Sequence, residues 1–248
     1  MTFKDHFSGH AGAYAAARPR YPSELFAWLA TQAPSTRLAW DAGTGNGQAA
    51  VALAAHFERV IATEPSAAQV DAAEPHPRVE YRVEPAEAPT LEAASVDLVT
   101  VAQAMHWFDL ERFHASVRRV LAPRGVIAVW TYGLSLVDAA VDREFMHLYD
   151  DVLGAYWPPE RRHVENGYAE LAFPYAPIET PDFAMTCEWT LGQYLAYLRT
   201  WSATTRYQRE HGGDPVANAT SRFEAAWGDA DAARTVRWPL RLRVGRVS

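Results

Sequence analysis

The segment from residue 38 to residue 47 most constrains this chain, because an apolar stretch there runs into an acid and three alternating glycines. Its sequence is Leu-Ala-Trp-Asp-Ala-Gly-Thr-Gly-Asn-Gly. Glycine has no Cβ, so its backbone can adopt positive φ and approach a ligand closely. A helix expected over about residues 48–56 would turn its N-terminal N–H groups toward that ligand. The segment therefore predicts a strand, a glycine loop and a helix that bind a nucleotide-like cofactor.

An acidic residue follows at the spacing that such a site requires. The second expected strand, residues 59–64, ends on Glu64, which lies 19 positions after Gly45. An acid about 20 residues past the glycine loop reaches ribose hydroxyls in nucleotide-binding α/β proteins. The dinucleotide pattern GxGxxG would place its third glycine where this chain has Gln48, and it seldom has an acid at the position of Asp41. These differences favour another nucleotide cofactor, with a nicotinamide-dependent oxidoreductase on a related fold as an alternative.

Composition narrows the class of protein. The 248 residues are 49% hydrophobic, which is enough for a full core. A single cysteine, Cys187, excludes an internal disulfide, and no Cys/His cluster has zinc-site spacing, so we expect no metal. No apolar run reaches the roughly 20 residues of a membrane span, which predicts a cytoplasmic protein without a membrane partner. The net charge of −7 argues against a nucleic-acid partner.

Apolar runs alternate with helical segments over the first half of the chain, as in a parallel sheet covered on both faces. Besides the strands already named, we expect strands at residues 79–83, 96–102 and 126–130 and helices at 66–73 and 110–121. Further on, we expect a helix at 137–153, a strand at 182–190, one long helix at 191–210 and a last strand at 238–247.

This order resembles the class I S-adenosylmethionine (SAM) dependent methyltransferases over residues 38–132. The glycine segment is similar to motif I of that family, Glu64-Pro65-Ser66 to its ribose-binding acid, and Ala86-Glu87 to the pair near the adenine. Many relatives have an aspartate where this chain has Pro85, so an adenine amino contact must come from the backbone or from another side chain. The resemblance implies an α/β Rossmann-like fold with a seven-stranded, mostly parallel sheet, an antiparallel last strand and a helical cap insertion.

The resemblance also implies SAM as cofactor and S-adenosylhomocysteine as product. The cofactor-binding residues that it implies are Tyr14, Arg18, Asp41, Ala42, Gly43, Thr44, Gly45, Gly47, Glu64, Pro65, Ser66, Ala86, Glu87 and Gln103. Residues 7–22 look like the leader helix and turn of type 11 small-molecule methyltransferases, similar to trans-aconitate methyltransferases, and residues 103–108 and 197–202 strengthen that resemblance.

Two groups of residues are candidates for contacting the methyl acceptor. His106 and Trp107 follow the fourth strand at its carboxyl end, where open α/β sheets bind ligands. A phenol or alcohol acceptor would need a base such as His106, whereas a carboxylate would not. In the expected long helix, Arg199 and Arg206 share one face and could receive a carboxylate, with Trp201 and Tyr207 beside them. All six side chains could instead serve only packing or surface roles, as could Tyr194 and Tyr197 of the same expected helix.

The sequence therefore predicts one catalytic domain. Residues 1–132 would form the lid helix and SAM-binding core, 133–237 the cap helices with the sixth strand, and 238–248 the final strand. The expected activity is methyl transfer from SAM to an oxygen, carboxylate or hydroxyl, of a small molecule by a monomer or homodimer. A non-catalytic SAM-binding partner is a further alternative.

Overall fold

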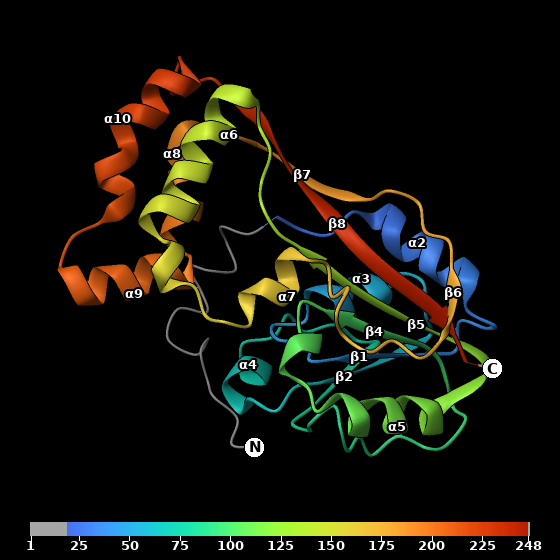
Figure 1. The fold of residues 1–248 in the computed structure, drawn as a ribbon. Helices are drawn as coiled ribbons and strands as arrows, with labels where there is room; N and C mark the ends of the chain where they lie inside the picture. The colour runs from blue at the N-terminus through green and yellow to red at the C-terminus, as the bar shows by residue number, and fades with distance from the viewer. Residues whose placement is uncertain (1–18, 248) are drawn as a thin grey trace.

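Residues 19–247, which the computed structural model describes, build an eight-stranded sheet in the order β3-β2-β1-β4-β5-β8-β6, with β7 paired to β8 (Figure 1). The strands are β1 Leu38–Ala42, β2 Arg59–Thr63, β3 Val79–Arg82, β4 Val96–Ala102, β5 Leu121–Tyr132, β6 Ala176–Ile178, β7 Ala184–Trp189 and β8 Arg234–Arg246. Strands β1 to β5 are parallel, and β8 runs antiparallel to β5, β6 and β7. The expected fold class is confirmed, with one more strand than the seven expected.

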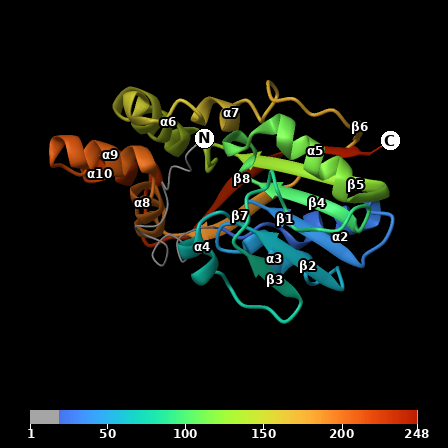
Figure 2. The ribbon, with the colours of Figure 1, turned by 90° about the horizontal axis from the view of Figure 1, so that it is seen from below.

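Alternate residues of the central strands face two separate hydrophobic cores. In β1, Ala39 belongs to the core beneath α2 (Ser23–Gln32) and α3 (Gln48–Leu53), whereas Trp40 belongs to the core beneath α5 (Leu110–Val120). Figure 2 shows α5 and α7 (Arg161–Glu165) on one side of the sheet and α2 and α3 on the other. This two-residue period is what a strand buried on both faces requires. The sheet is therefore a packed platform whose carboxyl edge is left to the loops.

The helices that follow β5 gather mainly beyond one end of the sheet (Figure 1). They are α6 Ala139–Met146, which continues as a π-helix at His147–Val152, a 3-10 helix at Gly154–Tyr156, α7, α8 Leu191–Arg199, α9 Ser202–His211 and α10 Pro215–Trp227. Apolar side chains of α6, α8 and α10 belong to the same core as α2 and α3. The helical layer is thus continuous with the core of the sheet. Among the described residues, no helix is long and apolar enough to cross a bilayer.

The expected single helix over residues 191–210 is wrong. It is broken into α8 and α9 at Trp201, which has extended backbone angles of φ −70° and ψ 141°. The Thr200 hydroxyl donates to the Tyr197 carbonyl (2.7 Å) and the Thr204 hydroxyl to the Leu198 carbonyl (3.0 Å). Hydroxyls that bind nearby carbonyls compete with the backbone N–H groups of a continuing helix. Arg199 and Arg206 therefore lie on different helices, and the premise that they share one helix face is wrong.

Strand β8 is longer than expected and belongs to two pairings. Residues 234–239 pair with β7, and residues 240–246 pair with β5. Pro239, which has no N–H to donate to a neighbour, stands where one pairing ends and the other begins.

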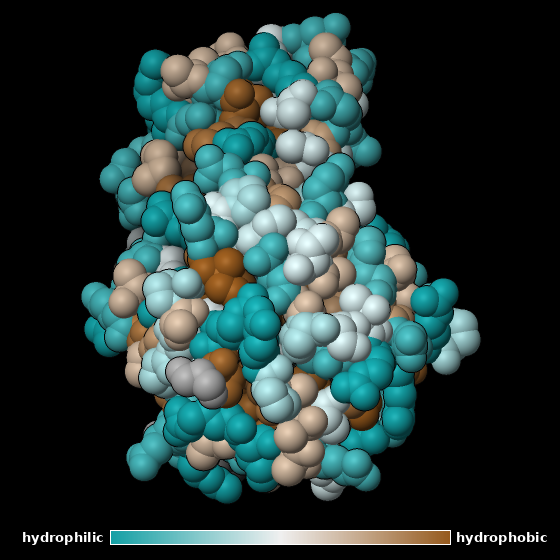
Figure 3. Space-filling view, turned by 90° about the vertical axis from the view of Figure 1, so that its right-hand side faces the viewer, coloured by the Kyte–Doolittle hydropathy of each residue, from teal (hydrophilic) through white to brown (hydrophobic). Residues whose placement is uncertain are grey.

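On the face seen from the right of Figure 1, hydrophobic side chains lie in small separate groups among hydrophilic ones (Figure 3).

Candidate cofactor and acceptor site

The glycine loop lies at the carboxyl ends of β1 and β2. Gly43, Gly45 and Gly47 all have positive φ, of 68°, 56° and 87°. The N–H groups of Gly43 and Thr44 both donate to the Thr63 carbonyl, at 2.9 and 3.0 Å. The loop is therefore anchored to the end of the neighbouring strand, in a conformation that other residues adopt only with strain.

The three glycines differ in what surrounds them. A Cβ on Gly43 would lie 2.7 Å from the Ala104 Cβ, and one on Gly47 would overlap the Tyr81 hydroxyl. A Cβ on Gly45 would meet no described atom within 4 Å. Gly43 and Gly47 thus permit close packing inside the protein, whereas Gly45 faces open space that a ligand can fill.

Asp41, in β1, is hydrogen-bonded to the glycine loop and to β4. Its side chain is 1% exposed, and its two carboxylate oxygens accept hydrogen bonds from the hydroxyls of Thr44 (2.6 Å) and Thr100 (2.7 Å). Burial raises the pKa of this carboxyl above its usual range, although the two threonine hydroxyls oppose the shift. These contacts give Asp41 a bracing role between β1, β4 and the glycine loop. A direct contact with a cofactor stays a prediction.

Glu64 joins the glycine loop to the next helix. One carboxylate oxygen accepts from the Gly45 N–H and the other from the Ser66 N–H, both at 3.1 Å. Ser66 is the N-cap of α4 (Ala67–Asp71). Pro65, between Glu64 and Ser66, is exposed. A carboxylate carries a negative charge and accepts hydrogen bonds, as the hydroxyls of a ribose require. Glu64 is therefore placed beside Gly45 as a ribose-binding acid requires.

The remaining sequence candidates on the cofactor side have contacts within the protein. Ala86 is buried, and the Glu87 carboxylate accepts from the Asp109 N–H at 2.8 Å, beside the start of α5. The Gln103 amide donates to the Tyr132 carbonyl at 2.8 Å, and Gln103 itself has a φ of +60°. These contacts shape the rim of the carboxyl edge. Tyr14 and Arg18 lie outside the described residues.

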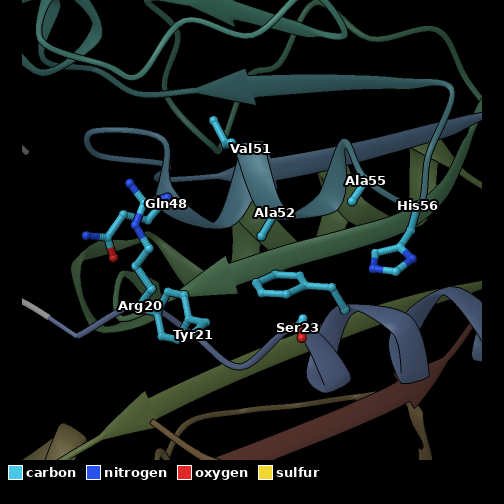
Figure 4. A pocket seen from close by; sticks show the side chains of 9 residues that line it. Arg20, Tyr21, Ser23, Gln48, Val51, Ala52, Ala55 and His56 are labelled. Carbon is cyan, nitrogen blue, oxygen red and sulfur yellow. The ribbon is translucent and has the colours of Figure 1, made fainter. Parts of the chain in front are cut away.

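A cavity of about 230 Å³ lies between α2 and α3 (Figure 4). Its lining is apolar in the middle and polar at the two ends, and consists of Arg20, Tyr21, Ser23, Phe26, Gln48, Val51, Ala52, Ala55 and His56. Arg20 forms an ion pair with Glu74 (3.2 Å), and the Glu74 N–H donates to the Asn46 carbonyl (3.2 Å). One end of the cavity therefore borders the glycine loop.

His106 lies on the loop that packs against the glycine loop through Ala104. Its Nδ1 is 2.9 Å from the Tyr168 hydroxyl, and its ring centroid is 4.6 Å from that of Trp107, which is 40% exposed. Burial, with smaller contributions from His163 and Arg161, lowers the pKa of His106 to about 4. The imidazole is therefore neutral near pH 7.

Sequence reasoning did not identify the partners of His106. Arg161, His163 and Tyr168 come from α7 and the turn after it, about 60 residues further along the chain. The Arg161 guanidinium lies over the rings of Trp157 (4.9 Å to the centroid) and Tyr149 (5.6 Å). Their only sequence signal is a basic Arg-Arg-His run at 161–163, which has no motif spacing.

The four residues predicted to bind the acceptor from the long helix have other surroundings. Arg199 forms an ion pair with Asp214 at 2.7 Å. Trp201 is buried, with its ring centroid 5.4 Å from those of Phe145 and Trp157. Tyr207 packs against Tyr156 and His211. Arg206, directly before Tyr207, lies on α9. Their role toward an acceptor stays a prediction, without the shared helix face that suggested it.

Known proteins share both the sequence and this fold. A family model for the type 11 methyltransferase domain matches residues 40–129. A protein of Dictyostelium discoideum described as a methyltransferase is 36% identical, over 92% of this chain and 89% of its own length. The chain belongs to the class I SAM-dependent methyltransferases. This family excludes the nicotinamide-dependent oxidoreductase alternative and makes the chain an enzyme rather than a non-catalytic partner.

Two further relatives agree with this assignment. The solved structure of a type II methyltransferase from Anaeromyxobacter dehalogenans is 48% identical, with a TM-score of 0.89, over 92% of this methyltransferase and 97% of that chain. A Saccharomyces cerevisiae protein described as a SAM-dependent methyltransferase is 26% identical, over 80% of each chain. SAM is the cofactor of the methyltransferase. The open space at Gly45 and the carboxylate of Glu64 beside it fit the nucleoside part of SAM.

Proposed function

We propose that the methyltransferase moves the methyl group of SAM to an oxygen atom, of a carboxylate or a hydroxyl, on a small-molecule acceptor. The observation that carries this proposal is the contact between the two loops at the carboxyl edge. Gly43 of the glycine loop packs closely on Ala104. His106 and Trp107 follow Ala104 within three residues, so both lie near the glycine loop. An acceptor bound against these two rings would lie next to the nucleotide site, where open α/β sheets bind their ligands.

The charges near His106 favour an oxygen acceptor over an amine. Arg161 and His163 both lower the pKa of His106, which places the positive charge of Arg161 within electrostatic reach of its ring. A protonated amine would be repelled by that charge, whereas a carboxylate or a polarised hydroxyl would be attracted. Glu165 lies 3.8 Å from Arg161 and offsets part of this effect.

The chemistry asks for positioning rather than strong acid–base groups. SAM supplies a methyl group on a positively charged sulfur, which is a good leaving group in an in-line displacement. The protein's part is to hold the acceptor oxygen in line and to exclude water. The proposal includes a cap role for residues 133–237, in which α6, α8, α9 and α10 contribute side chains to the same core as α2 and α3.

The test is a screen of acceptors with the purified enzyme. We expect S-adenosylhomocysteine release with a subset of carboxylic acids, phenols or alcohols, and mass spectrometry should locate the new methyl group on oxygen. Gly45→Val serves as the negative control, because the valine side chain would fill the open space at the loop and block SAM binding. Methylation of nitrogen or carbon by the wild type, or equal turnover by Gly45→Val, would contradict the proposal.

A further inference from the structure

Two histidine–tyrosine pairs join the segment after α7 to the β4–α5 region. The Tyr168 hydroxyl lies 2.9 Å from His106 Nδ1, and the Tyr175 hydroxyl lies 2.7 Å from His114 Nδ1. The second pair has an unambiguous proton arrangement. His114 Nε2 is 3.0 Å from the Ala172 carbonyl, which can only accept, so Nε2 carries the proton and Nδ1 accepts from Tyr175. His114 is therefore an internal reference for the Nε2–H tautomer.

The same arrangement follows for His106 from the surroundings of Tyr168. The Tyr168 side chain is fully buried, and burial raises its pKa far above the usual range, so the hydroxyl keeps its proton. Among the described residues, His106 Nδ1 is the hydrogen-bond partner of this hydroxyl. If Nδ1 carried the proton, the Tyr168 hydroxyl could only accept there, and its own buried proton would have no acceptor. The hydroxyl proton then goes to Nδ1 of His106, because a buried donor without a partner is costly.

We propose that Tyr168 fixes His106 as the Nε2–H tautomer, so that His106 meets the methyl acceptor as a hydrogen-bond donor and not as a general base. The contact of His106 with the acceptor rests on the proposed function. The tautomer of His106 does not depend on it. Within residues 19–247, Nε2 has no hydrogen-bond partner, whereas Nε2 of His114 is used by the Ala172 carbonyl. An acceptor held by an N–H group must offer an oxygen lone pair, which a carboxylate does without prior deprotonation.

The backbone around Tyr168 is built to hold this position. Tyr168 has a φ of +62°, directly after Gly167 at +67°. A bulky residue in the left-handed region is strained and persists where its surroundings impose it. The Arg243 guanidinium, from β8, donates to the carbonyls of Tyr168 and Leu171, the latter at 2.8 Å. The strained turn is thus clamped to the sheet while its ring reaches the loop after β4.

The charged groups around His106 agree with a neutral ring. His163 and Arg161 both disfavour protonation of His106, in addition to its burial. The carboxylates near them are held on those neighbours: Glu165 is 3.8 Å from Arg161, and Glu170 is 3.9 Å from His163. A neutral imidazole can donate from one nitrogen only, so the tautomer decides what His106 can do.

The direct test is nuclear magnetic resonance of the wild-type enzyme labelled with ¹⁵N-histidine, without acceptor or SAM. Two-bond ¹H–¹⁵N correlations distinguish the Nε2–H from the Nδ1–H tautomer. We expect His106 and His114 to show the same Nε2–H pattern at pH 7. Tyr168→Phe should change the pattern of His106 alone, and the matched variant Tyr175→Phe that of His114 alone. An Nδ1–H pattern for His106 in the wild type would overturn the proposal, whatever acceptor the enzyme uses.

The second test uses the acceptor found in the screen. Glutamine can place an N–H donor near the position of Nε2, whereas asparagine mimics Nδ1, so His106→Gln should keep kcat/KM within about tenfold of wild type and exceed His106→Asn. The pH profile of kcat/KM should have the same shape in wild type and His106→Gln between about pH 5 and 8. A rise with pH that disappears in His106→Gln would identify His106 as a base and overturn the inference. Methylation of nitrogen or carbon in the acceptor screen would instead contradict the proposed function and would leave the tautomer result unaffected.

Discussion

Gly45 and Gly47 stand two residues apart in one loop and both have positive φ, yet alanine should mainly lower stability at Gly47 and mainly lower SAM affinity at Gly45. Gly47→Ala places a Cβ on the Tyr81 hydroxyl and 2.9 Å from the ring carbon that bears it. Tyr81 must then move and give up its hydrogen bond to the Glu74 carbonyl, now 2.7 Å. Gly45→Ala adds a Cβ where no described atom lies within 4 Å.

The magnitudes follow from these surroundings. Both variants lose about 1–2 kcal/mol of unfolding free energy because alanine is strained in the left-handed region. Gly47→Ala adds about 1–3 kcal/mol for overpacking and about 1 kcal/mol for the lost hydrogen bond. Urea denaturation should therefore show Gly47→Ala to be the less stable variant by about 2–4 kcal/mol, with an unchanged m value.

SAM binding should separate the two variants in the other direction. Calorimetric titration at a temperature where both are folded should show that Gly45→Ala has lost at least about tenfold in affinity, because its methyl group occupies space left for the ligand. Equal stability of the two variants would refute the close approach of Tyr81. SAM affinity of Gly45→Ala within about twofold of wild type would refute the assignment of the open space to the cofactor.

Three further changes test other parts of the site. Glu64→Ala removes a charged acceptor beside Gly45 and should weaken SAM binding by about 10- to 100-fold in calorimetry; a loss below about twofold would remove Glu64 from the site. His106 has a folded-state pKa of about 4 against about 6.5 when unfolded, so the unfolded chain binds the extra proton between these values. The unfolding free energy should thus fall by up to about 3 kcal/mol from pH 7 to pH 4 through this group, and urea titrations should show a smaller fall in His106→Gln; parallel curves would contradict the shift. Trp201→Ala should cost about 3–5 kcal/mol of unfolding free energy because the ring is buried, and a fully stable variant with reduced turnover would instead give Trp201 a role at the acceptor.

The sequence was most informative where function depends on neighbours along the chain. The glycine loop and Glu64 lie within 22 residues of one another and are placed by two adjacent parallel strands, so pattern and spacing suffice to predict them. The strand from residue 96 to residue 102 is also confirmed, because its seven consecutive residues are nearly all buried between two layers. A short, mainly apolar run bounded by turn residues indicates a strand that is buried on both faces.

The sequence was least informative where a side chain takes its role from a distant partner. The sequence predicts Asp41 as an acid for the cofactor, but it does not reveal that Thr100, 59 residues away, donates a hydrogen bond to its carboxylate. The ring of His106 depends on Tyr168, 62 residues away, and on a turn with positive φ that no motif marks. The break at Trp201 arises from hydroxyl-to-carbonyl bonds that compete with a helix which apolar spacing alone favours.

Strand β8 has a consequence for the order in which this chain can fold during synthesis. Among the strands of residues 19–247, β6 and β7 pair with β8 alone, and β8 also covers the edge of β5. Because β8 follows all of these strands in the chain, none of the three pairings can form until residues 234–246 have left the ribosome. Until then β5 presents an open parallel edge, which is a template for pairing with other chains. A ribosome that stalls before residue 234 would therefore release a nascent chain with a cofactor loop but an unprotected sheet edge, a substrate for chaperones.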